Sequence, residues 1–580
     1  MTTPEIPDNQ PATAVSKIAP RSAAMPRRLA LLGIVALGLG LRLIGIRFGD
    51  PCAGCRPDEE TCLRQALFLL EGTHHIHFFN YPPGMMLLDA AWIRCLGILG
   101  ILPDDALKSW AENPMPFHIA VRVMAAMLGT STIAAVYVAS RRLFGVGAGL
   151  ASAALLAVMP LHVLHSHFGT LDVPGTAFAA WALAFAVLAG KSRPRVRFLV
   201  LAAAAAGIAA GIKYPMGIAL FWPLTRSFRY PSPGRAVAAV LIAFSAAFLI
   251  AAPTFLLQFR DARQGISIEA GSQQLGRSNW TGPHPLVYHV TRSIWNGGGE
   301  LPVILGVIGL ALLLRSSRQL AFLATPPVAL LLVHGFTGNV FFRYMLPVLP
   351  VLAVGAGAFW RIETSRRART AIVLLFAVGI LWSGMRALAY DLLLTRKDTR
   401  GELLDALADG RLPRDLPVVL PAAPFQLFPM ADMKRLVETF VLIGPPDEPC
   451  NRKIRDAVLR MVEDPSGERK PTEAMIFDAN SMPSIERDYA GREILMIIPT
   501  TFGGYFDWHH AELRRLRERA ARGELTLERV LSLDPNAGRA LPARDQYDRH
   551  DFWFVPFPNP SAVDRPGPMI DVYRVRFRAP

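Results

Sequence analysis

The sequence predicts an all-α polytopic membrane bundle, followed by a carboxy-terminal extracytoplasmic domain of α/β or α+β type. Of its 580 residues, 52% are hydrophobic and only 18% are charged, which is more apolar than an ordinary soluble protein of this length. Long apolar runs repeat between about residue 29 and residue 390, whereas the rest alternates short apolar runs with charged stretches. We therefore expect three parts: a disordered cytoplasmic amino terminus (1–27), a membrane domain (28–390) and a soluble periplasmic domain (391–580).

The apolar runs give about eleven candidate membrane spans. The first, 29–46, has 18 residues, which at about 1.5 Å per residue nearly cross a hydrocarbon core of ~30 Å. No small-residue cleavage site follows this run, so we expect it to stay in the protein. The expected spans are 29–46, 119–139, 146–164, 174–190, 197–212, 214–225, 236–258, 301–314, 319–336, 344–360 and 370–389.

One further apolar segment, 83–101, decides the orientation of the chain. It carries Asp89 and Arg94. If it is an interfacial helix at the outer surface, the basic clusters of the short loops all share the cytoplasmic side of Arg27 and Arg28. We therefore predict a multi-pass protein of a bacterial inner membrane with a cytoplasmic amino terminus. The loop positions also explain the net charge of +15, so nucleic acid is not an expected partner.

In this orientation the loops 47–118, 165–173, 259–300 and 337–343 are external. The first of them contains the acidic run Asp58-Glu59-Glu60 and, further on, Tyr81 after His74, His75 and His77. Carboxylates crowded beside a membrane surface can have raised pKa values, which suits a general base. The alternative is a solvated acidic turn after Pro57.

A second polar patch lies at the outer ends of two consecutive spans. It contains His162, His165, His167 and Asp172. Such groups are costly at the membrane boundary unless they face a wet cavity or one another. The alternative is that these histidines are merely interfacial.

Three cations break the positive-inside pattern. Arg122, Lys213 and Arg343 all lie at the external ends of expected spans. A lipid phosphate at the outer boundary would account for them. The alternative is snorkelling to phospholipid headgroups.

Together these segments resemble the GT-C membrane glycosyltransferases, in particular the superfamily of protein O-mannosyltransferases and lipid A aminoarabinose transferases. The resemblance covers about residues 28–400. It rests on the order and spacing of Arg56-Pro57-Asp58-Glu59, Tyr81-Pro82-Pro83, Arg122, Arg141-Arg142-Leu143-Phe144-Gly145, Pro160 through Asp172, Gly211-Ile212-Lys213-Tyr214 and Arg343-Tyr344-Met345-Leu346-Pro347.

The resemblance implies an inverting transfer of a sugar from a polyprenyl-phosphate donor to a hydroxyl acceptor (glycan, lipid or protein) at the periplasmic face. It assigns the catalytic base to Asp58, with Glu59 as the adjacent acid. Membrane lipids surround such an enzyme. The expected substrate-binding residues are Arg122, Lys213 and Arg343 for the lipid phosphate, Asp172 for the sugar or acceptor, and Tyr81, His165, His167 and Tyr344.

The five cysteines leave two readings open. Cys52, Cys55, Cys62, Cys95 and Cys450 would all lie outside or at the outer boundary, where disulfides are permitted. Cys52 could pair with Cys55 or Cys62, or a zinc ion could bind here with the nearby histidines. No metal ligand is assigned and no cofactor is required, although a divalent metal would be compatible with the expected reaction.

Two other functions stay open. A polytopic transporter of lipid-linked or small substrates would also have many spans, but its binding groups tend to lie near the middle of the membrane. An O-antigen-type ligase or polymerase would use a large external loop, for which 259–300 is the candidate.

Overall fold

The computed structural model describes residues 24–51, 56–72, 76, 78–190, 195–275, 283–421, 474–477, 482–499, 507–540, 555–557 and 559–578. Several residues singled out above lie outside this part of the chain, namely residues 1–23, Cys52, Cys55, His74, His75, His77 and Cys450.

The described chain is mostly helical, with several apolar helices, as predicted. The α-helices are α1 (Ala24–Leu43), α2 (Pro57–Leu70), α3 (Gly84–Ile98), α4 (Ala106–Glu112), α5 (Met115–Phe144), α6 (Val146–Val158), α7 (Pro160–His165), α8 (Asp172–Leu188), α9 (Val196–Ile212), α10 (Phe221–Ser227), α11 (Pro233–Ala251), α12 (Thr254–Leu257), α13 (Phe259–Leu275), α14 (Pro285–Tyr288), α15 (Trp295–Gly298), α16 (Glu300–Ala311), α17 (Ser317–Gly335), α18 (Val348–Ala356), α19 (Arg366–Leu394), α20 (Thr399–Ala408), α23 (Met482–Asp488) and α24 (Asp507–Ala521). Short 3-10 or π segments are η2 (Tyr214–Leu220), η3 (His289–Ile294), η4 (Leu314–Ser316), η5 (Phe342–Met345), η6 (Gly357–Arg361) and η9 (Pro560–Ala562).

Within the described residues, four helical segments are long and apolar enough to cross a membrane: Met115–Phe144, Pro233–Ala251, Leu314–Gly335 and Arg366–Ala408. The pair Pro285–Gly298 and Glu300–Ala311 passes the same test together but is bent by 109°. Four shorter apolar helices accompany them: Val146–Val158, Asp172–Leu188, Val196–Ile212 and Val348–Arg361. The number of eleven spans stays a prediction.

The longest apolar helix that lies deep in the bundle is α5. It has 30 residues and carries Arg141 and Arg142 in its last turn, where cations interact favourably with the helix dipole. Gly145, with φ of 100°, ends it in a conformation that other residues rarely adopt. The helix α6 begins at the next residue and returns along the bundle.

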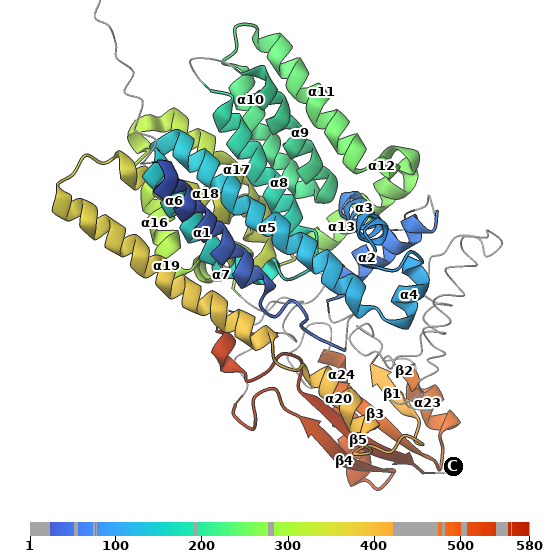
Figure 1. Cartoon of the computed structure of the whole chain (residues 1–580). Coiled ribbons are helices and arrows are strands. Elements are labelled where there is room, and N and C mark those ends of the chain that lie inside the picture. Colours follow the sequence, from blue (N-terminus) through green and yellow to red (C-terminus); the bar gives the residue numbers. More distant parts are fainter. Residues whose placement is uncertain are drawn as a thin grey trace, which may run out of the picture.

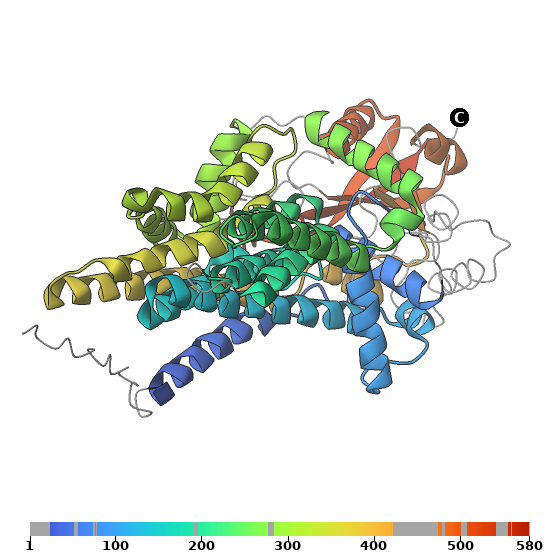
Figure 2. The ribbon, with the colours of Figure 1, turned by 90° about the horizontal axis from the view of Figure 1, so that it is seen from above.

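The helix α3 lies across the direction of α5, as the two perpendicular views show (Figures 1 and 2). Its first residue, Gly84, approaches the end of α9 so closely that a Cβ atom there would lie 2.3 Å from the carbonyl oxygen of Gly211. At its other end Ile98, Leu99 and Ile101 are exposed. The interfacial position of 83–101 stays a prediction.

The carboxy-terminal part contains a five-stranded sheet in the order β2-β1-β3-β5-β4. Its strands are β1 (Val418–Pro421), β2 (Ala474–Phe477), β3 (Glu493–Pro499), β4 (Leu525–Leu533) and β5 (Ile570–Phe577). The strand β1 is parallel to β2 and β3, whereas β5 is antiparallel to β3 and β4. The sheet is therefore mixed.

The sheet packs against the end of the bundle at which α19 ends (Figure 1). The ring of Phe557 lies 4.6 Å from that of Phe342 and 5.4 Å from that of Tyr390, between ring centroids. The amino-terminal ends of α1 and α19 lie at the opposite end (Figure 1). The bundle thus has two unlike ends.

Candidate active site

The first turn of α2 holds three acidic residues. The helix begins at Pro57, and Asp58, Glu59 and Glu60 follow, where carboxylates are stabilised by the amino-terminal end of the helix dipole. Successive residues of an α-helix point about 100° apart, so neighbouring acids face different surroundings. The side chain of Asp58 is 31% exposed, whereas that of Glu59 is fully buried. The two acids therefore have different environments.

Asp58 contacts residues from two distant segments. Arg343, in η5, donates from Nη2 to Oδ2 of Asp58 at 3.0 Å. The hydroxyl of Tyr81 lies 3.5 Å from the other carboxylate oxygen. The exposed fraction of Asp58 leaves its carboxylate reachable from solvent while both partners orient it.

Asp172 is the second carboxylate of the site. It is the first residue of α8, and its Oδ1 accepts from the ammonium of Lys213 at 2.5 Å. Its Oδ2 lies 3.5 Å from Nε of Arg343. Arg343 therefore connects the two carboxylates, and Asp58, Asp172, Lys213 and Arg343 form what we call the central cluster.

Tyr344 forms one wall beside the central cluster. The ammonium of Lys213 lies 5.0 Å from the centroid of the Tyr344 ring, within the range of a cation–π contact. The ring of His334 packs on the same tyrosine at 4.3 Å between centroids. The hydroxyl of Tyr344 accepts from the side-chain amide of Gln273 at 2.9 Å. The tyrosine thereby links the cluster to α13.

Glu59 lies in a separate buried ion pair. It accepts from Nε and Nη2 of Arg122 at 2.9 and 2.8 Å, from Nδ1 of His118 at 2.7 Å, and from the backbone N–H of Gly169 at 2.7 Å. Burial alone would raise the pKa of Glu59, but Arg122 and His118 outweigh it and lower that pKa to about 2. Glu59 is therefore ionised at neutral pH.

Arg122 is also fully buried and contacts the loop that follows α1. Its Nη1 donates to the carbonyl oxygens of Phe48 at 2.9 Å and Ile46 at 3.2 Å, and its guanidinium lies 3.6 Å from the centroid of the Phe48 ring. The Glu59–Arg122 pair thus ties α2, α5 and the chain after α1 together.

Gly169 allows the close approach that this pair needs. A Cβ atom at this position would lie 2.6 Å from Val121 and 3.2 Å from Cγ of Glu59. Any side chain here would displace one of them. The segment between α7 and α8 therefore reaches the buried carboxylate only with glycine.

The two predicted histidines lie beside the site rather than in the central cluster. His165 is buried, and its ring packs against Phe168 at 5.3 Å between centroids. The two ring nitrogens of His167 lie 2.8 Å from the carbonyl oxygen of Ile44 and 3.0 Å from that of Val163. These contacts hold the segment that leads to Asp172.

The structure thus brings together Asp58, Asp172, Lys213 and Arg343, with Tyr81 and Tyr344 at the cluster's edge. It places Arg122 with Glu59 instead. Sequence reasoning missed His118, which bridges Glu59 and, through Nε2 at 3.0 Å, Glu60. The spacing of His118 and Arg122, four residues apart on one helix, is the signal that indicates a shared face.

A disulfide or a zinc site was one expectation for the cysteines, two of which lie in the described residues. Cys62 is a free, buried thiol and Cys95 a free, exposed one. Burial, and then the negative charge of Asp89, raises the pKa of Cys62, so this thiol stays protonated. In the described part of the chain no three His, Cys, Asp or Glu residues are arranged to hold a metal ion.

Comparison with known proteins finds a matching sequence family and solved structures of similar fold. Residues 118–254, which include Arg122, Asp172 and Lys213, match the family described as dolichyl-phosphate-mannose-protein mannosyltransferase. The crystal structure of ArnT from Cupriavidus metallidurans, bound to undecaprenyl phosphate, aligns with 93% of this chain and 97% of its own, at 16% identity and a TM-score of 0.51. The apo oligosaccharyltransferase of Archaeoglobus fulgidus aligns over 94% and 88%, at 10% identity and a TM-score of 0.48. None of the curated protein sequences compared with this chain matches it.

The ArnT alignment spans nearly the whole of both chains, so the two proteins share a fold from the membrane bundle through the carboxy-terminal part. The family match falls on the helices α5 to α11, which carry two of the four central-cluster residues. The resemblance to the GT-C glycosyltransferases that the sequence predicted is confirmed: this chain has their fold and, over residues 118–254, matches their mannosyltransferase family.

Proposed function

We propose that this protein is a glycosyltransferase that moves a sugar from a polyprenyl-phosphate carrier to an acceptor hydroxyl with inversion at the anomeric carbon. The observation that carries the proposal is the central cluster. Two carboxylates, from α2 and α8, meet two cations there, from the residue after α9 and from η5. The family match over five of the predicted site residues, Arg122, His165, His167, Asp172 and Lys213, supports it.

Asp58 is the proposed catalytic base. It is the more exposed carboxylate of the cluster, because the side chain of Asp172 is only 2% exposed and is held by Lys213. Asp58 would accept the proton of the acceptor hydroxyl while that oxygen bonds to the anomeric carbon and the bond to the carrier phosphate breaks. Groups of this kind contribute typically about 10²–10⁴-fold to a rate.

The charges of the cluster support the departure of the phosphate. Two carboxylates and two cations have a formal sum of zero, so protonation of Asp58 leaves the cluster with one net positive charge. That charge appears as the leaving phosphate gains a negative charge. Lys213 and Arg343 are the proposed donors to this phosphate, and one well-placed donor can be worth about 3 kcal/mol.

We assign Glu59 and Arg122 a positioning role rather than direct contact with substrate. Both side chains are fully buried, and each satisfies the other. Their pairing fixes the first turn of α2, and hence the direction of Asp58. His165 and His167 are proposed to hold the segment that presents Asp172, next to the sugar or acceptor, with Tyr81 and Tyr344 lining the site.

The proposed topology places this site on the periplasmic side of a bacterial inner membrane. It comprises about eleven spans within 28–390, a cytoplasmic amino terminus over 1–27 and a periplasmic domain over 391–580. Arg141 and Arg142 in the last turn of α5, and Arg366 at the start of α19, favour a cytoplasmic location for the end of the bundle far from the sheet. The central cluster lies toward the other end.

A polyprenyl phosphate is the proposed carrier because a site on the outer face has no access to cytoplasmic nucleotide sugars. The ArnT structure with a similar fold holds undecaprenyl phosphate. The acceptor is proposed only as a hydroxyl compound. No cofactor is assigned.

The test is transfer in vitro from a panel of polyprenyl-phosphate sugars, with the wild type, Asp58→Asn and Asp104→Asn at matched expression. Asp104 is an exposed acid of the same predicted external loop and serves as the control. We expect wild-type rates for Asp104→Asn and a loss of about 10²-fold or more for Asp58→Asn. Equal rates for Asp58→Asn and wild type would remove Asp58 as the base.

A further inference from the structure

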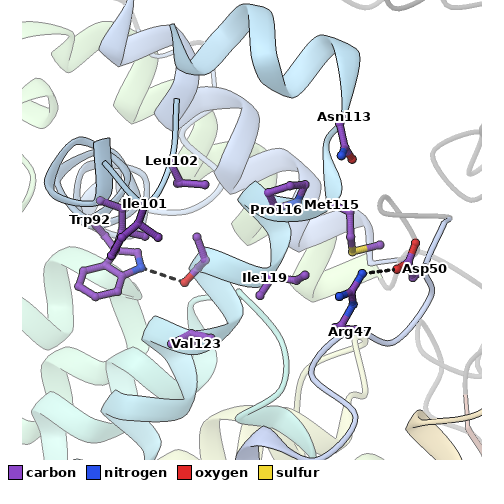
Figure 3. Close-up of a pocket in the computed structure, with 12 residues that line it drawn as sticks. Arg47, Asp50, Trp92, Ile101, Leu102, Asn113, Met115, Pro116, Ile119 and Val123 are labelled. Carbon is purple, nitrogen blue, oxygen red and sulfur yellow. Dashed lines mark hydrogen bonds and ion pairs between the residues drawn. The ribbon is translucent and has the colours of Figure 1, made fainter. Parts of the chain in front are cut away.

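A cavity of about 550 Å³ lies outside the central cluster, between α3, the loop that precedes α4, and the first turns of α5 (Figure 3). Its volume falls in the range of ~300–1,000 Å³ that is typical of small-molecule sites. Most of its wall is apolar. Trp92 and Leu96 of α3 form one side, and Ile119 and Val123 of α5 form another. No residue of the central cluster lines it.

The indole N–H of Trp92, in the apolar wall, already has a hydrogen-bond partner. The indole N–H of Trp92 donates to the carbonyl oxygen of Ala120 at 2.9 Å, so the ring presents carbon atoms to the cavity (Figure 3). Water gains little in such a space, because a buried water needs two to four polar partners. The chemistry of the wall therefore favours an apolar chain.

One side of the cavity is charged. Arg47 donates from Nη2 to Oδ2 of Asp50 at 3.0 Å, and their side chains are 69% and 40% exposed (Figure 3). A phosphate is a strong acceptor for a guanidinium, and an ammonium is a strong donor to a carboxylate. The pair thus complements a headgroup that carries both charges.

The same cavity borders an exposed apolar tip. Ile98, Leu99 and Ile101, at the end of α3, are 74%, 65% and 65% exposed, and Ile101 also lines the cavity. Three large exposed apolar side chains on a helix that lies across the bundle are typical of contact with a bilayer surface. A lipid chain could therefore reach the cavity directly from the membrane.

We propose that this cavity binds one phospholipid of the phosphatidylethanolamine type. An acyl chain lies between α3 and α5, the phosphate contacts Arg47 and the ammonium contacts Asp50. The lipid is a resident ligand of the bundle and not a substrate, so the proposal does not depend on the sugar-transfer reaction.

Native mass spectrometry of the full-length protein in detergent tests the proposal, with titration of phosphatidylethanolamine, phosphatidylglycerol and diacylglycerol. The double variant Ile119→Phe/Val123→Phe fills the cavity. The control Val373→Phe/Leu374→Phe makes the same kind of change on exposed positions of α19. We expect one tightly bound phosphatidylethanolamine in wild type and control, and affinity weakened at least about tenfold, or ~1.4 kcal/mol, in the filled variant.

The headgroup is tested with Arg47→Gln and Asp50→Asn. We expect Arg47→Gln to weaken both phospholipids, and Asp50→Asn to remove the preference for phosphatidylethanolamine over phosphatidylglycerol. Equal binding of all three lipids by the wild type would overturn the headgroup assignment. Unchanged binding in the filled variant would overturn the site itself.

A second measurement does not need the filled variant. The protein is placed in nanodiscs that contain phosphatidylethanolamine with brominated acyl chains. The difference in tryptophan fluorescence between wild type and Trp92→Phe then gives the emission of Trp92. We expect this difference to be quenched when the lipid is brominated. An unquenched Trp92 signal would contradict an acyl chain in the cavity.

Discussion

Arg343 donates a hydrogen bond of 3.0 Å to Asp58 although 285 residues separate them in the chain. The same guanidinium reaches Asp172 through Nε at 3.5 Å. This geometry requires the planar fork of arginine, because a lysine ammonium cannot present two donors in fixed directions. The contact joins the first turn of α2 to η5.

The first prediction concerns Arg343. Arg343→Gln should lower kcat by about 10²-fold, since it removes one donor to the developing phosphate charge. Arg343→Lys should recover part of this loss, because it restores the charge without the second contact. Single-turnover transfer at saturating donor measures both. Arg361→Gln, an exposed arginine in η6, is the control and should retain the wild-type kcat.

The second prediction concerns Lys213, whose ammonium is held at 2.5 Å from Asp172. Lys213→Met should weaken inhibition by free polyprenyl phosphate by about tenfold, equivalent to ~1.4 kcal/mol. Competition of polyprenyl phosphate with the sugar donor provides the measurement. An unchanged inhibition constant would separate Lys213 from phosphate binding.

The third prediction concerns the stability of the Glu59–Arg122 pair. Glu59→Gln leaves the guanidinium of Arg122 buried without its counter-ion, and breaking a buried pair in this way typically costs about 3–5 kcal/mol. Thermal unfolding in detergent should therefore begin at a clearly lower temperature. The neighbouring Asp58→Asn should change it little, because Asp58 is partly exposed. Similar melting of all three proteins would show that the pair contributes no stability.

The fourth prediction gives the pH dependence of this pair. The pKa of Glu59 is lowered from 4.5 to about 2 in the folded protein, so its contribution to stability is complete above about pH 5 and is lost as the pH falls toward 2. Wild-type melting temperatures should decline over that interval more steeply than those of Glu59→Gln. Parallel curves would contradict the assignment.

The fifth prediction tests the topology. Cys95 is exposed at the end of α3, and Cys62 is buried. In a chain with the other three cysteines replaced, a membrane-impermeant maleimide should label Cys95 from outside intact spheroplasts and leave Cys62 unlabelled. A cysteine introduced at Ser365, just before α19, should react only after the membrane is opened. Labelling of the Ser365 site from outside would invert the proposed orientation.

The sequence allowed the central cluster to be predicted because the loop charges predict that all four residues lie on one side of the membrane. Once Lys213, Arg343 and Asp172 were all placed on the outer side with Asp58, their proximity became the natural expectation. Tyr344 directly follows Arg343 in the chain, and Tyr81 belongs to the Tyr81-Pro82-Pro83 segment that carries the resemblance. These residues were predictable because short loops confine their neighbours to one membrane surface.

The partner of Arg122 could not be predicted in the same way. The sequence predicts that Arg122 lies at the external end of a span, but the direction of its side chain depends on how α5 rotates against α2. His118, one helical turn earlier, shares its face and makes Glu59 the nearer partner. In a sequence, an arginine that pairs with a buried carboxylate looks the same as an arginine that binds a phosphate. Only the packing of the helices distinguishes the two roles.

In the carboxy-terminal part, the boundary between α24 and β4 was also hard to predict from the charge pattern. The stretch 510–530 is rich in charged residues throughout, which favours one continuous helix, yet α24 ends at Ala521 and β4 begins at Leu525. Gly523, with φ of 74°, lies at the change of direction. A glycine in the left-handed conformation commonly ends a helix, and this signal marks the boundary.

The most direct test of the central claim separates donor binding from chemistry at Asp58. Asp58→Asn is loaded with a labelled polyprenyl-phosphate sugar, acceptor is added, and release of the carrier phosphate is followed in a single turnover. We expect the variant to bind the donor with an affinity close to that of the wild type but to transfer its sugar at least about 10²-fold more slowly. Transfer at the wild-type rate from the bound donor would contradict this expectation.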